Sequence, residues 1–67
     1  MLKFRYSKHA RFRMVERGIS EKEVENAIIK GRKYIQDDKI ISSYSYFEVV
    51  YKKIGEIIYV ITVKPRW

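Results

Sequence analysis

Residues 18–31 read G-I-S-E-K-E-V-E-N-A-I-I-K-G, a stretch that carries the signals for both ends of a helix. The Ser20 hydroxyl is placed to accept a hydrogen bond from the Glu23 amide, while the Glu23 carboxylate accepts one from the Ser20 amide, which is a capping box. Gly31 then ends the helix. The apolar positions recur at i, i+3 and i+4 and are Val24, Ala27 and Ile28. We therefore expect a helix with one apolar stripe facing a core.

Elements of two kinds flank this helix. Before it, Ser7 can cap a helix over residues 8–17, and Gly18 supplies the left-handed residue that ends it. After it, runs rich in Tyr, Ile and Val predict strands. These strands cover residues 33–37, 44–52 and 56–64, and residues 2–6 can add a short edge strand. The order predicts an α+β fold in which two N-terminal helices pack on a three- or four-stranded antiparallel sheet.

The last two predicted strands form a hairpin. Residues 53–55, K-I-G, read as a three-residue turn with Gly55 at the left-handed position. The resulting pairs are Tyr51 with Ile57, Val49 with Tyr59, Phe47 with Ile61 and Ser45 with Val63, which makes one face apolar. The opposite, mixed face then carries Tyr44, Tyr46, Glu48 and Val50 beside Ile58, Val60, Thr62 and Lys64.

The chain is strongly basic, with 15 Lys and Arg against eight Asp and Glu, a net charge of +7. Its 67 residues allow one small basic domain, residues 1–67, and the absence of cysteine excludes disulfides and thiolate metal sites. Residues 1–17 hold six of the cations against Glu16 alone, so they carry +5 of the total. The six are Lys3, Arg5, Lys8, Arg11, Arg13 and Arg17. This balance favours a polyanionic partner such as RNA, DNA or an acidic protein.

One edge of the first helix combines an imidazole with two guanidinium groups. At 100° per residue, His9, Arg13 and Arg17 fall within about 80° of one another. Arginine suits bidentate contact with phosphate, and histidine is the residue type that exchanges protons most readily near neutral pH. The same residues also fit a solvated basic face, with Arg17 favoured at a helix C-terminus and His9 capping or packing the first turn.

A second group of residues, near the C-terminal end, interleaves aromatic rings with cations. It consists of Tyr44, Tyr46, Thr62, Lys64, Arg66 and Trp67. Single-stranded nucleic acid is bound by this combination, because bases stack on the rings while cations contact the backbone. Ordinary packing of tyrosines within a sheet is the alternative.

The sequence gives less support for a metal site, a cofactor site or a membrane segment. Residues 37–38, D-D, form the one adjacent carboxylate pair, but they lie in an expected turn without metal-ligand spacing around them, and no metal or cofactor is expected. No apolar run approaches the roughly 20 residues of a membrane span, and the first residues lack the apolar core of an export signal. We expect a cytoplasmic protein that does not enter a membrane.

Short motifs spread along the chain resemble a known family. They are residues 6–10 (Y-S-K-H-A), 13–14 (R-M), 17–20 (R-G-I-S), Val24 and residues 60–63 (V-I-T-V). The pattern resembles the family called domain of unknown function 4258, which is similar in helix and sheet order to the RelE/ParE-type toxins, small basic proteins of which many cut messenger RNA without a metal. The resemblance implies that His9, Arg13, Arg17 and Thr62 match the family's recurrent polar residues.

The favoured function is a small RNA-directed, toxin-like protein. In its enzymatic form, a metal-independent ribonuclease, the 2′-hydroxyl of the substrate attacks the adjacent phosphate and His9 transfers a proton. The candidate catalytic residues are His9, Arg13, Arg17, Thr62 and Lys64. The candidate nucleic-acid-binding residues are Lys3, Arg5, Lys8, Arg11, Tyr44, Tyr46 and Arg66. The alternatives are a non-catalytic nucleic-acid-binding module and a protein that pairs with a small acidic antitoxin, and an oligomer is compatible with each.

Overall fold

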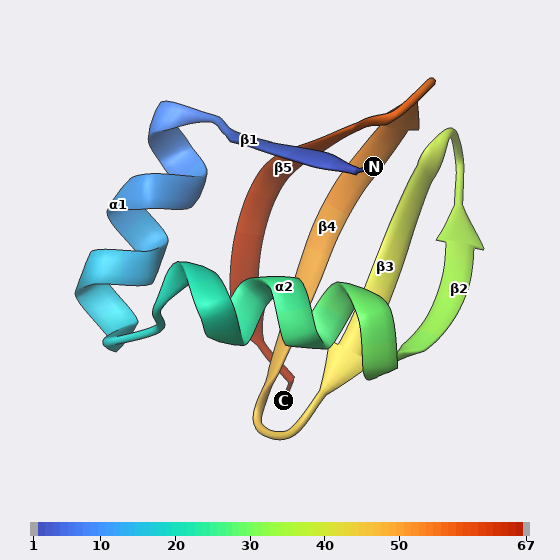
Figure 1. Ribbon diagram of the computed structural model, residues 1–67. Helices are drawn as coiled ribbons and strands as arrows, with labels where there is room; N and C mark the ends of the chain where they lie inside the picture. The colour runs from blue at the N-terminus through green and yellow to red at the C-terminus, as the bar shows by residue number, and fades with distance from the viewer. Residues whose placement is uncertain (1, 67) are drawn as a thin grey trace.

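Two helices and five strands make up the computed structural model, which describes residues 2–66 (Figure 1). The elements are β1 (Lys3–Tyr6), α1 (Lys8–Arg17), α2 (Glu21–Lys30), β2 (Arg32–Gln36), β3 (Lys39–Tyr44), β4 (Phe47–Ile54) and β5 (Ile57–Pro65). The strands form one sheet in the order β1-β5-β4-β3-β2. α2 crosses one face of this sheet, and α1 lies beside the edge formed by β1 and β5 (Figure 1). Neither helix is long and apolar enough to cross a membrane.

The α+β class and the two leading helices are confirmed, but the predicted sheet was wrong in size and in kind. β1 is the expected edge strand, yet it runs parallel to β5, so the sheet is mixed. β3 was not predicted, because its two serines are poor strand formers. One of them, Ser42, is fully buried and donates its hydroxyl to the Ala27 carbonyl of α2. This bond satisfies a polar group that would otherwise oppose burial.

The helix ends follow the sequence signals. The Ser7 hydroxyl accepts the Ala10 amide at 3.0 Å, and Gly18 ends α1 with φ 68°. In α2 the Glu23 amide donates to the Ser20 hydroxyl at 3.2 Å and the Ser20 amide donates to the Glu23 carboxylate at 3.0 Å. Gly31 ends α2 with an extended backbone instead of a left-handed one, φ −72°.

The core lies between the helices and one face of the sheet. α1 contributes Ala10 and Met14, and the predicted stripe of Val24, Ala27 and Ile28 comes from α2. The sheet contributes Phe47, Val49 and Tyr51 from β4 and Ile58, Val60 and Val63 from β5. This composition confirms the predicted core-facing positions of β4.

The predicted register of the β4–β5 hairpin was wrong. β4 continues to Ile54, which pairs with Ile57, so the turn consists of residues 55–56, with Gly55 left-handed as expected at φ 60°. Val50 pairs with Thr62 whereas Tyr51 pairs with Val60, which leaves Ile61 as the extra residue of a β-bulge. Because the turn is one residue shorter than predicted, Ile58 and Val60 face inward in place of the predicted Ile57, Tyr59 and Ile61. The bulge at Ile61 then changes the parity of β5, so Val63 faces inward as predicted.

Candidate nucleic-acid interface

The two faces of the sheet have different surroundings. Because side chains alternate along a strand, the residues between the core positions point to the opposite face, which neither α1 nor α2 covers (Figure 1). We call this the uncovered face. Within residues 2–66 its cations are Lys3, Arg5, Arg32, Lys39, Lys52 and Lys64. The one carboxylate carried by a strand on this face is Glu48. Four of the eight carboxylates lie in the helices, beside six Lys and Arg, so the carboxylates are concentrated away from the uncovered face.

Tyr59 occupies the centre of a row of three residues on the uncovered face. It stands opposite Arg5 of β1 and opposite Lys52 of β4, and its side chain is 39% exposed. Directly opposite residues in neighbouring strands have Cβ atoms about 4.5–5.5 Å apart. An exposed aromatic ring therefore lies between two cationic side chains, an arrangement that suits a base stacked on the ring with backbone phosphates on either side.

A second exposed ring, Tyr34 of β2, lies at the other end of the same face. Its hydroxyl donates to Glu48 at 3.0 Å, and this hydrogen bond raises the pKa of Tyr34. The Lys64 ammonium lies 3.8 Å from the other oxygen of Glu48. The Glu48 carboxylate is therefore compensated by Tyr34 and Lys64.

Asp38 at the tip of the β2–β3 hairpin contacts two of these cations. Its carboxylate lies 3.0 Å from Lys52 and 3.6 Å from Lys39. The hydrogen bond from Lys52 is the main reason that the pKa of Asp38 is lowered. These pairs are solvent-exposed, so a polyanion can replace the carboxylate at small cost.

The predicted row of His9, Arg13 and Arg17 runs along α1. Arg11, on the other flank of the helix, stacks over the Tyr6 ring at 4.9 Å and pairs with Glu21 at 2.6 Å, so that flank faces the α2 side. His9 lies about 200° from Arg11 around the helix, which turns His9 and Arg13 toward the side of the uncovered face. His9 and Arg17 are about 12 Å apart along the axis, so the three residues form a row and do not surround one phosphate.

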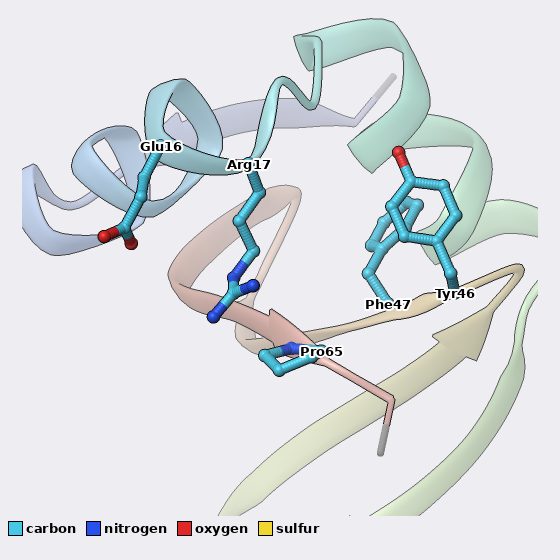
Figure 2. A pocket seen from close by; sticks show the side chains of 5 residues that line it. All are labelled: Glu16, Arg17, Tyr46, Phe47 and Pro65. Atoms are coloured by element: carbon cyan, nitrogen blue, oxygen red, sulfur yellow. The ribbon is translucent and has the colours of Figure 1, made fainter.

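Arg17 lines a pocket of about 320 Å³ together with Glu16, Tyr46, Phe47 and Pro65 (Figure 2). Figure 2 shows the Arg17 side chain extending from α1 toward Pro65, with the rings of Tyr46 and Phe47 on the other side of the opening. The Tyr46 ring meets Phe47 edge-on, with centroids 5.3 Å apart. A guanidinium and a half-exposed phenol at one opening can hold the phosphate and the base of a single nucleotide.

The other predicted site residues are scattered. Tyr44 was placed on the mixed face, but it packs against the core because it pairs with the inward-facing Phe47. Thr62 and Lys64 do lie on the uncovered face, whereas Lys8 is exposed at the start of α1. Arg66 donates to the Ser45 carbonyl at 3.0 Å, and Trp67 lies outside the described residues. The predicted aromatic and cationic cluster therefore does not form one group among residues 2–66.

Sequence reasoning missed Tyr34, Lys52 and Tyr59 as candidate binding residues. The assumed three-residue turn placed Tyr59 on the apolar face, and the two-residue turn at 55–56, which pairs Tyr59 with Lys52, reverses that assignment. The alternation E-I-I-Y-V over residues 56–60 is compatible with either face, so no local signal in β5 could have identified it.

Most of the chain matches the model of a known protein family. The family described as Domain of unknown function (DUF4258) matches residues 6–65. No curated protein and no solved structure matches the chain. The matched range includes both helices, the α1 row and all of β2 to β5.

Proposed function

This chain belongs to the DUF4258 family, and we propose that it is a small RNA-directed protein of the toxin type that binds single-stranded RNA across the uncovered face of its sheet. The observation that carries the proposal is the row Arg5, Tyr59 and Lys52, in which the register of three strands sets an exposed ring between two cations. Bases stack on such a ring whatever their sequence, and the flanking cations contact phosphates.

The α1 row and the Arg17 pocket extend this surface. His9 and Arg13 lie on the flank of α1 that is turned toward the uncovered face, and α1 packs mainly against β5. Their spacing of about one helical turn suits contacts to successive positions of a nucleic-acid backbone. A strand of RNA that stacks on Tyr59 can therefore continue along α1 toward the opening beside Tyr46.

The toxin assignment comes from the resemblance to RelE/ParE-type proteins and from the basic charge of +7. RNA accessible to such a protein is in the cytoplasm, which is the location we propose. A small acidic partner protein has the charge needed to cover the uncovered face, in which case it would compete with RNA for the same cations.

Binding is tested by titrating a labelled, unstructured RNA at rising ionic strength. Affinity should fall steeply with salt because condensed counterions are released. Arg5→Gln should lower the slope of log K against log salt by about 0.7, the value expected for one contact with single-stranded nucleic acid. Lys22→Gln, which removes an exposed cation on the first turn of α2, is the matched control and should leave the slope unchanged.

The stacking contact is tested by Tyr59→Ala, which should weaken binding by about 1–3 kcal/mol. Val15→Ala removes an apolar side chain that is 83% exposed on α1 and lies about 160° around the helix from Arg13, and it should have no effect. RNA affinity that is absent at low salt, or that falls equally in both variants, would show that the uncovered face is not the binding surface.

RNA cleavage is the second candidate function, and the placement of His9 favours it. His9 is exposed, its imidazole makes no hydrogen bond or ion pair within residues 2–66, and it lies one turn from Arg13. In this mechanism the substrate's 2′-oxygen attacks the adjacent phosphorus and the bond from phosphorus to the 5′-oxygen breaks, which leaves a 2′,3′-cyclic phosphate and a 5′-hydroxyl. His9 takes the proton of the 2′-hydroxyl, and water protonates the departing 5′-oxygen. The Arg13 guanidinium leaves its exposed ion pair with Glu16 and stabilises the charge on the phosphate. Arg17, about 12 Å from His9 along the helix, would hold a neighbouring nucleotide.

His9→Ala separates cleavage from binding. If His9 transfers a proton, cleavage in the presence of a chelator should fall by about 10²- to 10⁴-fold while RNA affinity stays nearly constant. Arg13→Ala should weaken binding and cleavage together, because its contact exists in the ground state as well. A wild-type protein that binds RNA and yields no new ends would exclude this second function and leave the binding proposal intact.

A further inference from the structure

β2 leaves one edge of the sheet open. Among residues 2–66 it pairs only with β3, all five of its residues are exposed, and it lies on the far side of the molecule from α1 (Figure 1). In an antiparallel ladder every second residue of an edge strand turns its backbone N–H and C=O away from the neighbouring strand. An edge of this kind is a template for pairing with another chain.

We propose that β2 pairs with β2 of a second copy of this chain, antiparallel and about a two-fold axis at Ile35, to form a homodimer with one continuous sheet. The two sheets of five strands would then join side by side. The pairing is isologous, because the same residues contribute from each copy. It does not depend on RNA, so it can be tested independently of the function proposed above.

The register follows from symmetry and charge. Residues opposite each other in an antiparallel pair point to the same face, so a two-fold axis perpendicular to the sheet requires one residue to stand opposite its own copy. An axis at Lys33 would set two lysines against each other. An axis at Tyr34 would set Lys33 against Ile35. Only an axis at Ile35 matches an apolar residue with itself and Lys33 with a carboxylate, Asp37 of the second copy.

The charges at the ends of β2 support this register. Cations on an edge strand normally keep copies apart, and β2 begins with Arg32 and Lys33. With the axis at Ile35 the register carries Arg32 and Lys33 toward Asp38 and Asp37 of the second copy, the two turn residues that follow β2, so each cation approaches a carboxylate. Asp38 would exchange the exposed ion pairs of its own copy for this contact. Asp37 is exposed and has no ion pair among residues 2–66. The two-fold axis repeats these contacts between cations and carboxylates at both ends of the paired strands.

The centre of the proposed interface is apolar. Ile35 is 75% exposed. It pairs with Ile40, a residue that packs against the core, so it points to the side of the sheet on which α2 lies. Pairing about the axis would bring the Ile35 side chains of the two copies together on that side. A contact made by a five-residue strand is small, so we expect a weak dimer that depends on concentration.

Dimerisation would also enlarge the candidate RNA surface. An axis perpendicular to the sheet keeps the uncovered faces of both copies on the same side. The two rows of Arg5, Tyr59 and Lys52 would then lie at the outer parts of one wide basic surface.

A single cysteine at the axis tests the geometry. The chain has no cysteine, and opposite residues in an antiparallel pair have Cα atoms about 4.5–5.5 Å apart, within the range of a disulfide. Under mild oxidation, Ile35→Cys should form a covalent dimer about tenfold faster than Ile54→Cys, because pairing raises the effective concentration of the thiols. Ile54 is 64% exposed at the end of β4 and serves as the matched control. Equal rates would overturn the proposal.

Sedimentation measured over a concentration series tests the association itself. The wild-type protein should show a mass that rises with concentration, and Ile35→Lys should remain a monomer with an unchanged circular dichroism spectrum, since Ile35 contributes little to the core. Asp37→Asn should weaken the dimer without altering the left-handed turn residue, because Asn tolerates that conformation. A wild-type protein that stays monomeric at millimolar concentration, or an Ile35→Lys variant that associates equally well, would exclude this interface.

Discussion

At the scale of single residues, the Tyr6 hydroxyl is buried and has no hydrogen-bond partner among residues 2–66. Tyr6→Phe removes that hydroxyl and keeps the ring on which Arg11 stacks. Because an unsatisfied buried hydroxyl opposes folding, the variant should be as stable as the wild type or more stable by up to about 1 kcal/mol at pH 7. Urea denaturation measures the difference, and a loss of more than 1 kcal/mol would mean that the hydroxyl has a favourable contact.

The same residue gives a prediction for alkaline pH. Burial, followed by the carboxylates of Glu21 and Glu25, raises the pKa of Tyr6 to about 12, against the opposing effect of Arg11. In the unfolded chain the pKa of this tyrosine is near 10, so as the pH rises the unfolded state releases the hydroxyl proton before the folded state does. The free energy of unfolding of the wild type therefore falls as the pH rises from about 10 through 12. The advantage of Tyr6→Phe over the wild type should therefore grow across this range in denaturation curves and should be constant below it.

Position 31 requires glycine because neighbouring atoms leave no room for a Cβ atom. Its φ of −72° is open to any residue, but a Cβ there would overlap the Ala27 carbonyl and the Ser42 hydroxyl and would lie 2.9 Å from the Ser43 carbonyl. Gly31→Ala should destabilise the protein by about 1–3 kcal/mol, the usual cost of overpacking. Gly55→Ala is a useful comparison, because nothing lies within 4 Å of its added Cβ and its cost would come from φ 60° alone.

At the scale of elements, the two serine caps should differ in their contribution. Ser20→Ala should cost about 1 kcal/mol through loss of the α2 cap. Ser7 caps α1 and also donates its hydroxyl to the Ile61 carbonyl of the β5 bulge at 2.6 Å. Ser7→Ala should therefore cost about 2 kcal/mol, the cap plus one further hydrogen bond. Equal denaturation midpoints for the two variants would show that the bond to β5 contributes nothing to stability.

The helices were predictable because their signals are local, whereas the sheet register was not, because it depends on contacts between residues far apart in the chain. Caps and apolar stripes are local, so Ser7, Gly18 and the Ser20 capping box identify both helices from neighbouring residues alone. The bulge at Ile61 is supported by Ser7, 54 residues away, and no local pattern in β5 records that contact. β3 depends likewise on the bond between Ser42 and α2. The misplacement of Tyr59, and with it the centre of the candidate site, follows directly from the register.

At the scale of the whole molecule, the cations of the uncovered face should affect stability and binding in opposite directions. Lys3 and Arg5 lie on β1 among cations of the uncovered face, where mutual repulsion opposes folding. The double variant Lys3→Gln, Arg5→Gln should gain a few tenths of a kcal/mol in stability at low salt while it loses RNA affinity. The gain should disappear at high salt, because exposed charges are screened. A double variant that is less stable at low salt would contradict the repulsion argument.

The topology that joins Ser7 to β5 also bears on how the chain folds during its synthesis. β5 follows every other described element in the chain, yet it lies between β1 and β4 in the sheet. At a ribosomal rate of roughly 5–20 residues per second, the 54 residues between Ser7 and Ile61 take roughly 3–11 s to emerge. During that interval β1 has no neighbouring strand, and α1 lacks β5, the strand against which it mainly packs. The nascent chain is therefore open to chaperones, to proteases and to aggregation until β5 has emerged, whatever the stability of the finished protein.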